Sequence, residues 1–438
     1  MMLGTLCLLF TLIHSLDTIF ARSTTMALCA GSDREMILQV RQVTSSRDPV
    51  ATPDALVDLA NRAFTNAEEG LVRPDANGQV VRLTLQSTRE QLDRGEFLIL
   101  TGRHASSTKP PVLLGCCTVV KLEDAATGEW GCLAVEPAYQ KRGYGQRLAL
   151  AAEYHLSDLY GCRTLQIKLL GFAKPVQEAN NPAYEHKERL IQWYTQKLAY
   201  KTVPHEALYF AANSSWGNVQ DTIFESDAVL LPFRKFATTW IELATTTDES
   251  HMGQLVEFCN NVYQEGESGI LQHTPENPII RLLVPDAMEL IQKQQLLVLW
   301  EKTSTDDNND NNKQPIGCIK AEIVKQKTGE WGCLAVHPKY QHKGYARRLV
   351  QAAEYHLQHK YGCTQLQLQL LTPVDWTQTH KERLRGWYQD RLDYQPLESC
   401  RDYKAKGDTL GPLVFATDAV FTTYAKSVGD KLQTANGR

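Results

Sequence analysis

The sequence predicts a mixed α/β (α+β) protein built from two copies of one domain, and three observations support this fold class. First, the 36 residues from Thr127 to Cys162 recur from Thr328 to Cys363 without a gap, and 25 of the 36 positions are identical. Second, short alternating apolar runs typical of strands are interspersed with amphipathic helical stretches around each copy. Third, a chain of 438 residues is long for one hydrophobic core and comfortable for two.

The first domain is expected over residues 31–237. Alternation predicts a strand over 34–43, and a helix with Pro53 near its start follows over 53–64. Ser87, with Glu90 three residues later, fits a capping box and predicts a second short helix over 87–95. The remaining expected elements are strands over 96–100, 112–122, 131–135 and 164–170, an amphipathic helix after the third of these, and a last helix over 186–200.

The second domain, residues 238–438, is expected to repeat this order. Its predicted elements are a strand within 238–247, helices from Glu249 and near Pro285, strands over 295–300, 315–324 and 364–371, the repeated strand and helix, and a helix over 380–394. The run "DDNNDNN" (306–312) has low complexity and predicts a solvated loop.

Composition argues against several classes of protein. A net charge of −4 offers no basic field for nucleic acid, so no nucleic-acid partner is expected. The eleven cysteines are an odd number without CxxC pairs or His-rich metal spacing. Several, such as Cys116 and Cys318, lie in apolar runs typical of buried free thiols. Neither a disulfide framework nor a metal site is therefore expected.

Residues 1–30 form a candidate leader segment. The apolar stretch from Leu3 to Leu16 has the length of a signal-peptide core and is short for a membrane span, so no firm membrane partner is expected. The first positive charge is Arg22, whereas a signal peptide usually carries positive charge before its core. Two interpretations stay open: a secretory or organelle-targeting signal, or an upstream start codon before a cytoplasmic protein that begins at Met26.

The turn between the repeated strand and helix predicts an anion site. It reads "QKRGYG" (140–145) in the first copy and "QHKGYA" (341–346) in the second. Glycine lets the backbone approach a ligand, and the first N–H groups of a helix point outward without partners. Lys141 and Arg142 add positive charge, so a pyrophosphate fits the turn, although a glycine here also serves as a simple connector. The turn lacks the third glycine of a Rossmann motif and the GK[ST] of a P-loop.

Two motifs resemble those of a known family. The run "LAVEPAYQKRGYG" is similar to the Q/RxxGxG/A motif of the GNAT superfamily of acyl-CoA-dependent N-acyltransferases, and "LIQWYTQKLAY" resembles that family's FYxxxGF element. The order of expected elements is also the family's, and it occurs twice. The resemblance implies two tandem GNAT folds, each with a largely antiparallel sheet that splays at the motif strand. It also implies acetyl-CoA as co-substrate.

The resemblance also assigns candidate cofactor-binding residues. It implies that backbone groups of one strand segment pair with the pantetheine arm and that the turn's amides hold the pyrophosphate. These residues are Leu133, Ala134, Val135, Gln140, Lys141, Arg142, Gly143, Tyr144 and Gly145 in the first copy, and Leu334, Ala335, Val336, Gln341, His342, Lys343, Gly344, Tyr345 and Ala346 in the second.

Two departures from the family pattern put the fine contacts to the pantetheine arm in question. The asparagine usual seven residues before the helix tyrosine is replaced by Lys187 and Lys381. The final "GF" is replaced by Ala199-Tyr200 in the first copy and by "DY" at 393–394 in the second.

Acetyl transfer requires a base for the attacking amine and a proton for the departing thiolate. Glu129 and Glu330 stand where some GNAT enzymes place a glutamate base, and the alternative is a solvated glutamate in a "TGE" turn. Tyr194 and Tyr388 stand where the family often has its general acid, and the alternative is a tyrosine that only packs on an apolar helix face. The repeated His155 and His356 fall on a face expected to pack against the sheet and are interpreted as core.

The sequence therefore predicts an N-acetyltransferase that moves the acetyl group of acetyl-CoA to a primary amine of a small molecule or peptide by direct attack. Two alternatives stay open. In one, a single domain is catalytic and the other is a structural or acyl-CoA-binding module. In the other, the protein is a non-enzymatic CoA-responsive binding protein.

Overall fold

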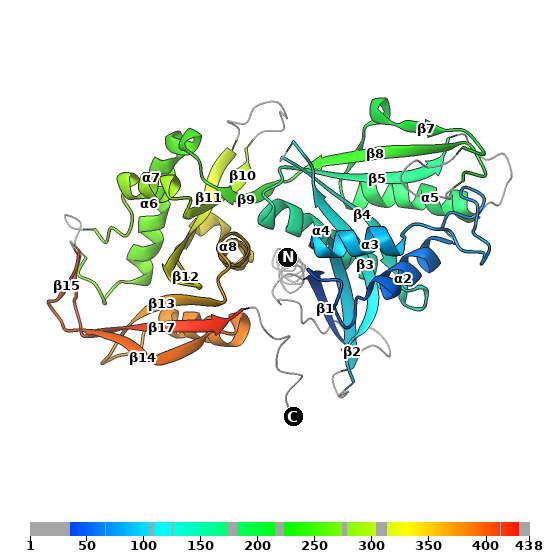
Figure 1. Cartoon of the computed structure of the whole chain (residues 1–438). Helices are drawn as coiled ribbons and strands as arrows, with labels where there is room; N and C mark the ends of the chain where they lie inside the picture. Colours follow the sequence, from blue (N-terminus) through cyan, green and yellow to red (C-terminus); the bar gives the residue numbers. More distant parts are fainter. Residues whose placement is uncertain are drawn as a thin grey trace, which may run out of the picture. The chain divides into compact units, whose positions relative to one another are not determined.

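The computed structural model describes residues 36–65, 67–104, 109–124, 126–173, 182–214, 223–273, 278–303, 313–411 and 413–428. The leader segment 1–30 and the predicted loop 306–312 lie outside these ranges. The described residues form two compact units, divided after Ala237 (Figure 1). Within them, no helix combines the length and the apolar composition needed to cross a membrane.

The first unit is built on a mixed sheet of eight strands. Their order is β1-β2-β3-β4-β5-β8-β6, with β7 also paired to β8. Only β4 and β5 pair in parallel among these described strands. The strands are β1 (Met36–Val43), β2 (Phe97–His104), β3 (Val112–Lys121), β4 (Thr127–Val135), β5 (Thr164–Phe172), β6 (Lys201–Thr202), β7 (Leu208–Phe210) and β8 (Ala228–Phe236).

The second unit repeats this arrangement with seven strands in the order β9-β10-β11-β12-β13-β17-β14. Its parallel pair is again the repeated strand and its successor, β12 and β13. The strands are β9 (Thr239–Leu243), β10 (Leu296–Lys302), β11 (Lys313–Lys325), β12 (Thr328–Val336), β13 (Gln365–Pro373), β14 (Gln395–Lys404) and β17 (Ala419–Ser427), with a small separate pair of β15 (Thr409–Leu410) and β16 (Leu413–Val414). The prediction of two mixed, largely antiparallel sheets is confirmed.

Helices cover both faces of each sheet. On β4, Ala134 packs with the α2 residues Leu56 and Leu59, whereas Trp130 packs on the other face with Leu148 of α4. Regular alternation would place these two residues on the same face, and an extra residue in β4 between Gly131 and Ala134 reverses the alternation. The helices are α2 (Pro53–Thr65), α3 (Leu85–Asp93), α4 (Tyr144–Tyr154) and α5 (Pro182–Gln192) in the first unit, and α6 (Glu249–Gly266), α7 (Val284–Gln292), α8 (Tyr345–Tyr361) and α9 (Thr379–Gly386) in the second.

The predicted cap of the second short helix is wrong. α3 begins before Ser87, and its N-cap is Thr84, whose side chain accepts a hydrogen bond from the Ser87 N–H at 3.2 Å. The Ser87 hydroxyl in turn accepts from the Thr84 N–H at 3.3 Å, so Ser87 stands at the third helical position. Glu90 lies a turn further on and accepts from Gln86. Thr84 and Ser87 both fit the sequence pattern of an N-cap, and only the backbone conformation shows that Thr84 is the cap.

The predicted last helices over 186–200 and 380–394 end early. α5 passes into a π-helical turn over Trp193–Lys197, and Ala199 then adopts a left-handed conformation with φ 60°. Asp393 has the same conformation, φ 62°, after the corresponding turn of the second unit. The Tyr200 N–H bonds back to the Tyr194 carbonyl at 3.0 Å, so the chain leaves the helix here.

Candidate active site

The motif strand and its parallel neighbour pair over part of their length and then separate. We call the point of separation the fork. β4 pairs with β5 only from Thr127 to Glu129, opposite Thr164–Gln166, and β12 pairs with β13 only from Thr328 to Glu330. Beyond this fork, residues 130–135 keep a strand partner on the β3 side alone. The backbone on the other side of Leu133, Ala134 and Val135 therefore faces an opening, which suits an extended arm that adds to the sheet as a strand.

A bulge lies next to the fork in both units. Thr118 pairs with Gly131 and Cys116 with Ala134, so two residues of β4, Cys132 and Leu133, stand opposite one residue of β3. Cys132 has φ 46° and its counterpart Cys333 has φ 48°. The bulge turns the strand at the place where its partner is lost, and both copies reproduce it.

The turn after the strand forms an uncapped helix N-terminus. A short 3₁₀ turn over Pro137–Tyr139 follows β4, and Gly143, with φ 81°, is the N-cap of α4. No side chain caps that helix end. Gly344 has the same φ and role before α8, again without a capping side chain. Exposed N–H groups and the helix dipole make such an end attractive to an anion.

Side chains support the turn in a similar way in both copies. The Gln140 side chain donates to the Val135 carbonyl at 3.1 Å, and Gln341 does the same to Val336. Lys141 and Arg142 are exposed. The Arg142 guanidinium lies 5.1 Å from the centre of the Tyr139 ring. In the second copy the Lys343 ammonium lies 5.2 Å from the ring of Tyr340. Positive charge therefore stands beside each helix end.

The predicted base residues lie on strands rather than in turns. Glu129 is the last β4 residue paired with β5, and it is half-buried. Its carboxylate accepts from the Gln166 side chain at 2.7 Å and forms an ion pair with Lys168 at 2.8 Å. Glu330 accepts from Gln367 at 2.6 Å.

The two forks differ at one position. Lys168 of the first unit corresponds to Gln369 in the second, so the lysine beside the Glu129 carboxylate has an uncharged counterpart near Glu330.

The predicted acid residues are buried on the other face. Tyr194 packs edge-on against Trp130, with ring centroids 6.0 Å apart, and lies 5.8 Å from Phe233. Burial raises the pKa of the Tyr194 phenol, and likewise the pKa of Tyr388. Trp130 packs on the α4 face, so the alternation of the strand places Glu129 on the opposite face. Glutamate and tyrosine thus lie on opposite faces of the sheet.

The tyrosines of the "AY" and "DY" departures belong to a buried network that sequence reasoning missed. The Trp130 indole donates to the Tyr200 hydroxyl at 2.7 Å, and Trp331 donates to Tyr394 at 2.6 Å. The Tyr394 hydroxyl then donates to Glu354, which pairs with Lys426 at 2.7 Å. A phenylalanine at either tyrosine position would leave the buried tryptophan N–H without an acceptor. The sequence signal for this network was the recurrence of the same Trp and Tyr in both copies.

The other departure, Lys187, is also buried and pairs with Glu68 at 3.2 Å. His155 is buried with its ring 4.6 Å from that of Tyr160, as expected of a core residue, and His356 is half-buried. No group of three or more metal-binding side chains occurs within the described ranges.

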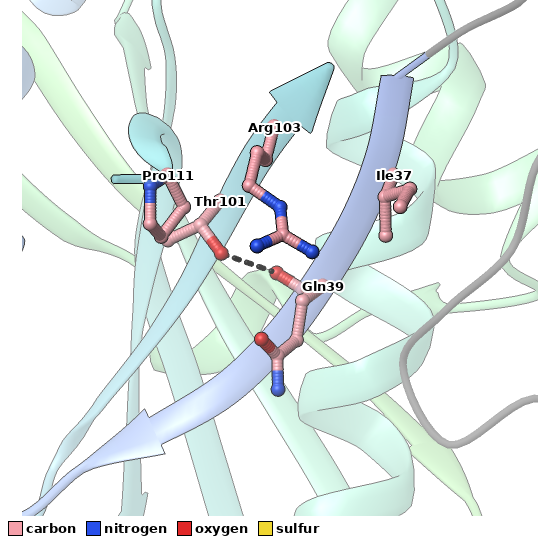
Figure 2. A pocket seen from close by; sticks show the side chains of 5 residues that line it. All are labelled: Ile37, Gln39, Thr101, Arg103 and Pro111. Atoms are coloured by element: carbon pink, nitrogen blue, oxygen red, sulfur yellow. Dashed lines mark hydrogen bonds between the residues drawn. The ribbon is translucent and has the colours of Figure 1, made fainter. Parts of the chain in front are cut away.

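A hollow of about 270 Å³ lies elsewhere in the first unit. Figure 2 shows the five side chains that line it, Ile37, Gln39, Thr101, Arg103 and Pro111, with the Thr101 hydroxyl donating to the Gln39 carbonyl at 3.4 Å. None of the predicted cofactor-binding residues lines this hollow.

Comparison with known proteins gives one family and many similar folds. The model described as the acetyltransferase (GNAT) family matches residues 63–186 and 283–393. No curated protein matches the sequence.

Solved structures with a similar fold include three N-acetyltransferases. They are the NatC complex bound to Gag peptide and CoA (14% identity, 44% of this chain, 100% of that chain, TM-score 0.29), the ribosomal-protein-S18-alanine N-acetyltransferase from Escherichia coli (12%, 44%, 97%, 0.28), and aminoglycoside 6′-N-acetyltransferase complexed with coenzyme A (16%, 45%, 96%, 0.29).

Proposed function

Because the chain belongs to the acetyltransferase (GNAT) family, whose model matches more than half of it, we propose that it is an N-acetyltransferase that uses acetyl-CoA. The observation that carries this proposal is the opening beside each motif strand, which ends at an uncapped helix N-terminus flanked by positive charge. An extended arm along residues 133–135 leads to a pyrophosphate at the turn 140–145, and residues 334–336 and 341–346 form the same path.

In the proposed reaction the amine nitrogen of the acceptor attacks the thioester carbonyl carbon. Glu129 or Glu330 takes the proton that the amine loses. The carbon–sulfur bond then breaks, and the CoA thiolate takes a proton from Tyr194 or Tyr388, which solvent later replaces. The acceptor is a primary amine of a small molecule or peptide.

The buried phenol fits the role of acid. Burial raises its pKa, so the hydroxyl holds a proton at neutral pH that it can donate as the carbon–sulfur bond breaks, and solvent must return that proton because the phenolate is the stronger base. The position of the tyrosine opposite the glutamate lets the amine approach from one face of the sheet while the leaving group is protonated from the other.

A second candidate is that a single unit is catalytic and the other is a structural or acyl-CoA-binding module. The observation that favours it is a difference between the two units. Lys168 forms an ion pair with the Glu129 carboxylate in the first unit, whereas the corresponding residue of the second unit is the uncharged Gln369. In the first unit the amine must therefore reach a carboxylate whose Oε2 already contacts two side chains.

The experiment is a thiol-release assay with acetyl-CoA against a panel of primary amines, run on the full chain and on Glu129→Gln, Glu330→Gln and the double variant. We expect amine-dependent release that the double variant lowers at least tenfold. A single variant that removes all activity would identify the working unit and support the second candidate. Tight acetyl-CoA binding without release for any amine would instead indicate a non-enzymatic CoA-binding protein.

A further inference from the structure

The two candidate bases lie in surroundings of different charge, although their strands and forks match. We call the charged groups around Glu129 the first base site and those around Glu330 the second base site. In the first, Lys168 forms an ion pair with Glu129 at 2.8 Å, and Gln166 donates to the same carboxylate oxygen, Oε2. The charges of Glu129 and Lys168 therefore balance.

The second base site lacks this balancing cation. The Glu330 carboxylate accepts from the Gln367 side chain at 2.6 Å, as Glu129 accepts from Gln166, so the supporting amide is kept. Glu330 forms no ion pair within the part of the chain that the structure describes. The residue that corresponds to Lys168 is Gln369, which is exposed and uncharged.

A further carboxylate lies beside Glu330. Glu322 of β11 is directly opposite Glu330 of β12, whereas the residue opposite Glu129 is the apolar Val120 of β3. Opposite residues on paired strands point to the same face, with their Cβ atoms about 5 Å apart. Two carboxylates therefore share one face in the second base site, an arrangement of like charges that is unfavourable by itself.

Nearby cations balance one of these two carboxylates and not both. Lys320 pairs with Glu322 at 2.5 Å. Lys293 also interacts with the charge of Glu322, but it pairs with Glu289 at 2.5 Å. Glu322 and Glu330, with one paired lysine, leave one negative charge in the second base site.

The first base site has a further cation behind its glutamine, and that cation is also paired. The Arg234 guanidinium donates to Gln166 at 2.7 Å and to both carboxylate oxygens of Glu206, at 2.6 and 2.5 Å. Arg234 lies opposite Gln166 on the paired strand, and the residue opposite Gln367 in the second unit is Ala425. The first base site is therefore neutral and the second is negative.

This difference affects how an amine binds. A primary amine with a pKa of about 10.4 arrives near pH 7 mostly as an ammonium ion, which a carboxylate attracts. In the second base site, one carboxylate can receive the reacting nitrogen while the other attracts a second cation of the same molecule. In the first, the Lys168 ammonium repels such a cation.

We propose that, within the acetyltransferase function argued above and resting on it, the second unit acetylates amines that carry a second positive charge, whereas Lys168 makes the first unit select amines without one. The reacting nitrogen lies at Glu330 and the second cation at Glu322, about 5 Å away across the strand pair. The bonds that form and break are those of the proposed reaction, with Glu330 taking the proton of the attacking nitrogen. Short amines with a terminal guanidinium and peptide amines beside an arginine have this chemistry.

The test uses pairs of amines that differ only in that second charge. They are agmatine and its neutral urea analogue N-carbamoylputrescine, and glycyl-argininamide and glycyl-citrullinamide, each with one primary amine. Thiol release from acetyl-CoA gives kcat/KM, and the ratio of the charged to the neutral amine is the readout. The full chain with Glu129→Gln reports the second unit, and the full chain with Glu330→Gln reports the first.

We expect the charged amine to exceed the neutral one about fivefold or more in the second unit at low salt, the size of one charge interaction near a protein surface. The ratio should fall as ionic strength rises, because salt screens exposed charges. In the first unit we expect a ratio of about one or less, since that base site is neutral and Lys168 lies within it.

Exchange of the differing residue tests its role directly. Lys168→Gln should raise the ratio in the first unit, and Gln369→Lys should lower it towards one in the second. Both side chains are exposed, so neither change disturbs the core. Lys197→Gln and Gln358→Lys make the same changes of charge on helical segments outside the two sheets and should leave both ratios unchanged.

Equal ratios in the two units, with amine-dependent thiol release, would overturn this inference and leave the proposed function standing. Ratios that the two exchange variants fail to move in folded proteins would also overturn it. If a single unit releases thiol, its own exchange variant decides in the same way. The absence of thiol release with every amine, while acetyl-CoA still binds, would overturn the proposed function and this inference with it.

Discussion

At the scale of single residues, the packing role of the tyrosine on the last helix is compatible with the proposed role of general acid. Tyr194 packs against Trp130 and Phe233, so it is a core residue. Its phenol is also held protonated by burial, which raises its pKa, and that is the state a general acid needs before the thiolate forms. Packing and proton donation are compatible because packing uses the ring and proton donation uses the hydroxyl.

Replacement of the hydroxyl alone separates these roles. Tyr194→Phe keeps the ring, so we expect kcat to fall at least tenfold with little change in the KM for acetyl-CoA, since the hydroxyl acts mainly in the transition state. Steady-state kinetics on Tyr194→Phe, Tyr388→Phe and the double variant check this. If the double variant keeps its kcat while chemistry limits turnover, the tyrosines only pack.

Ala199 offers a prediction about stability. It is exposed and has φ 60°, where a Cβ is strained and glycine is not. We expect Ala199→Gly to raise the free energy of unfolding by about 0.5–1 kcal/mol, because strain is removed and no contact is lost. Urea unfolding measures it. Ala151→Gly within α4 is the control and should lower stability by about 1 kcal/mol; a lowered stability in Ala199→Gly would contradict the strain argument.

At the scale of elements, the strand, the turn and the following helix form one unit that both copies keep. The backbone of the turn is nearly identical, with Lys141 and His342 both at φ 62° before the N-cap glycines. Around Gly143 and Gly344, no heavy atom lies within 4 Å of the place where a Cβ would stand. A side chain there meets no protein atom beyond its chain neighbours, so we expect its effects to come from backbone strain and from contact with the proposed cofactor.

We expect Gly143→Glu and Gly344→Glu each to weaken acetyl-CoA binding in its own unit by at least one to two orders of magnitude, because phosphate contacts worth about 1.5–3 kcal/mol each are lost. Gly143→Glu should reduce turnover more. The first turn carries Lys141 and Arg142, whereas the second has His342, which is mostly neutral near pH 7. Calorimetry and thiol release measure both effects.

Gly143→Ala and Gly344→Ala are the matched controls, since alanine adds backbone strain without a charge near the phosphates. Loss of turnover in Gly344→Glu, with turnover intact in a folded Gly143→Glu, would show that the second unit does the work.

At the scale of the whole molecule, each unit contains its own fork, bulge and uncapped helix end. We therefore expect two acetyl-CoA molecules per chain, measured by isothermal titration calorimetry. Gly143→Glu should reduce the stoichiometry to one, and so should Gly344→Glu. A single site in the unmodified chain would favour the interpretation in which one unit has kept only a structural role.

Buried tyrosines should make the whole chain sensitive to alkali. Burial raises the pKa of Tyr194, Tyr200, Tyr388 and Tyr394. Below about pH 10 these phenols are protonated in both the folded and the unfolded state, and the stabilisation is complete. As the pH rises above about 10, the unfolded chain loses these protons while the folded one keeps them, so stability falls by roughly 1.4 kcal/mol per pH unit for each tyrosine.

Urea midpoints between pH 8 and 12 measure this slope. Tyr388→Phe should reduce the slope by roughly 1.4 kcal/mol per pH unit, the contribution of one tyrosine proton. Tyr209→Phe, at an exposed position, should leave it unchanged. Equal slopes in the unmodified chain, Tyr388→Phe and Tyr209→Phe would show that tyrosine burial does not cause the loss of stability at high pH.

The sequence by itself determined the two-copy organisation, the order of strands and helices, the glycine turn before the repeated helix and the family. These features depend on patterns a few residues long: alternation along a strand, helical periodicity, and a glycine between a strand and a helix. The cap of α3 was misassigned even so, because Thr84 and Ser87 both fit the pattern.

Only the tertiary structure decided which distant groups meet. Lys187 and Glu68 are 119 residues apart in the chain, and Trp130 and Tyr200 are 70 apart. The partners of Glu129 depend on the register between β4 and β5, and the opening depends on where that pairing stops. No local pattern encodes these pairings, because they arise when the sheet and its helices pack together and bring buried charges within reach of one another.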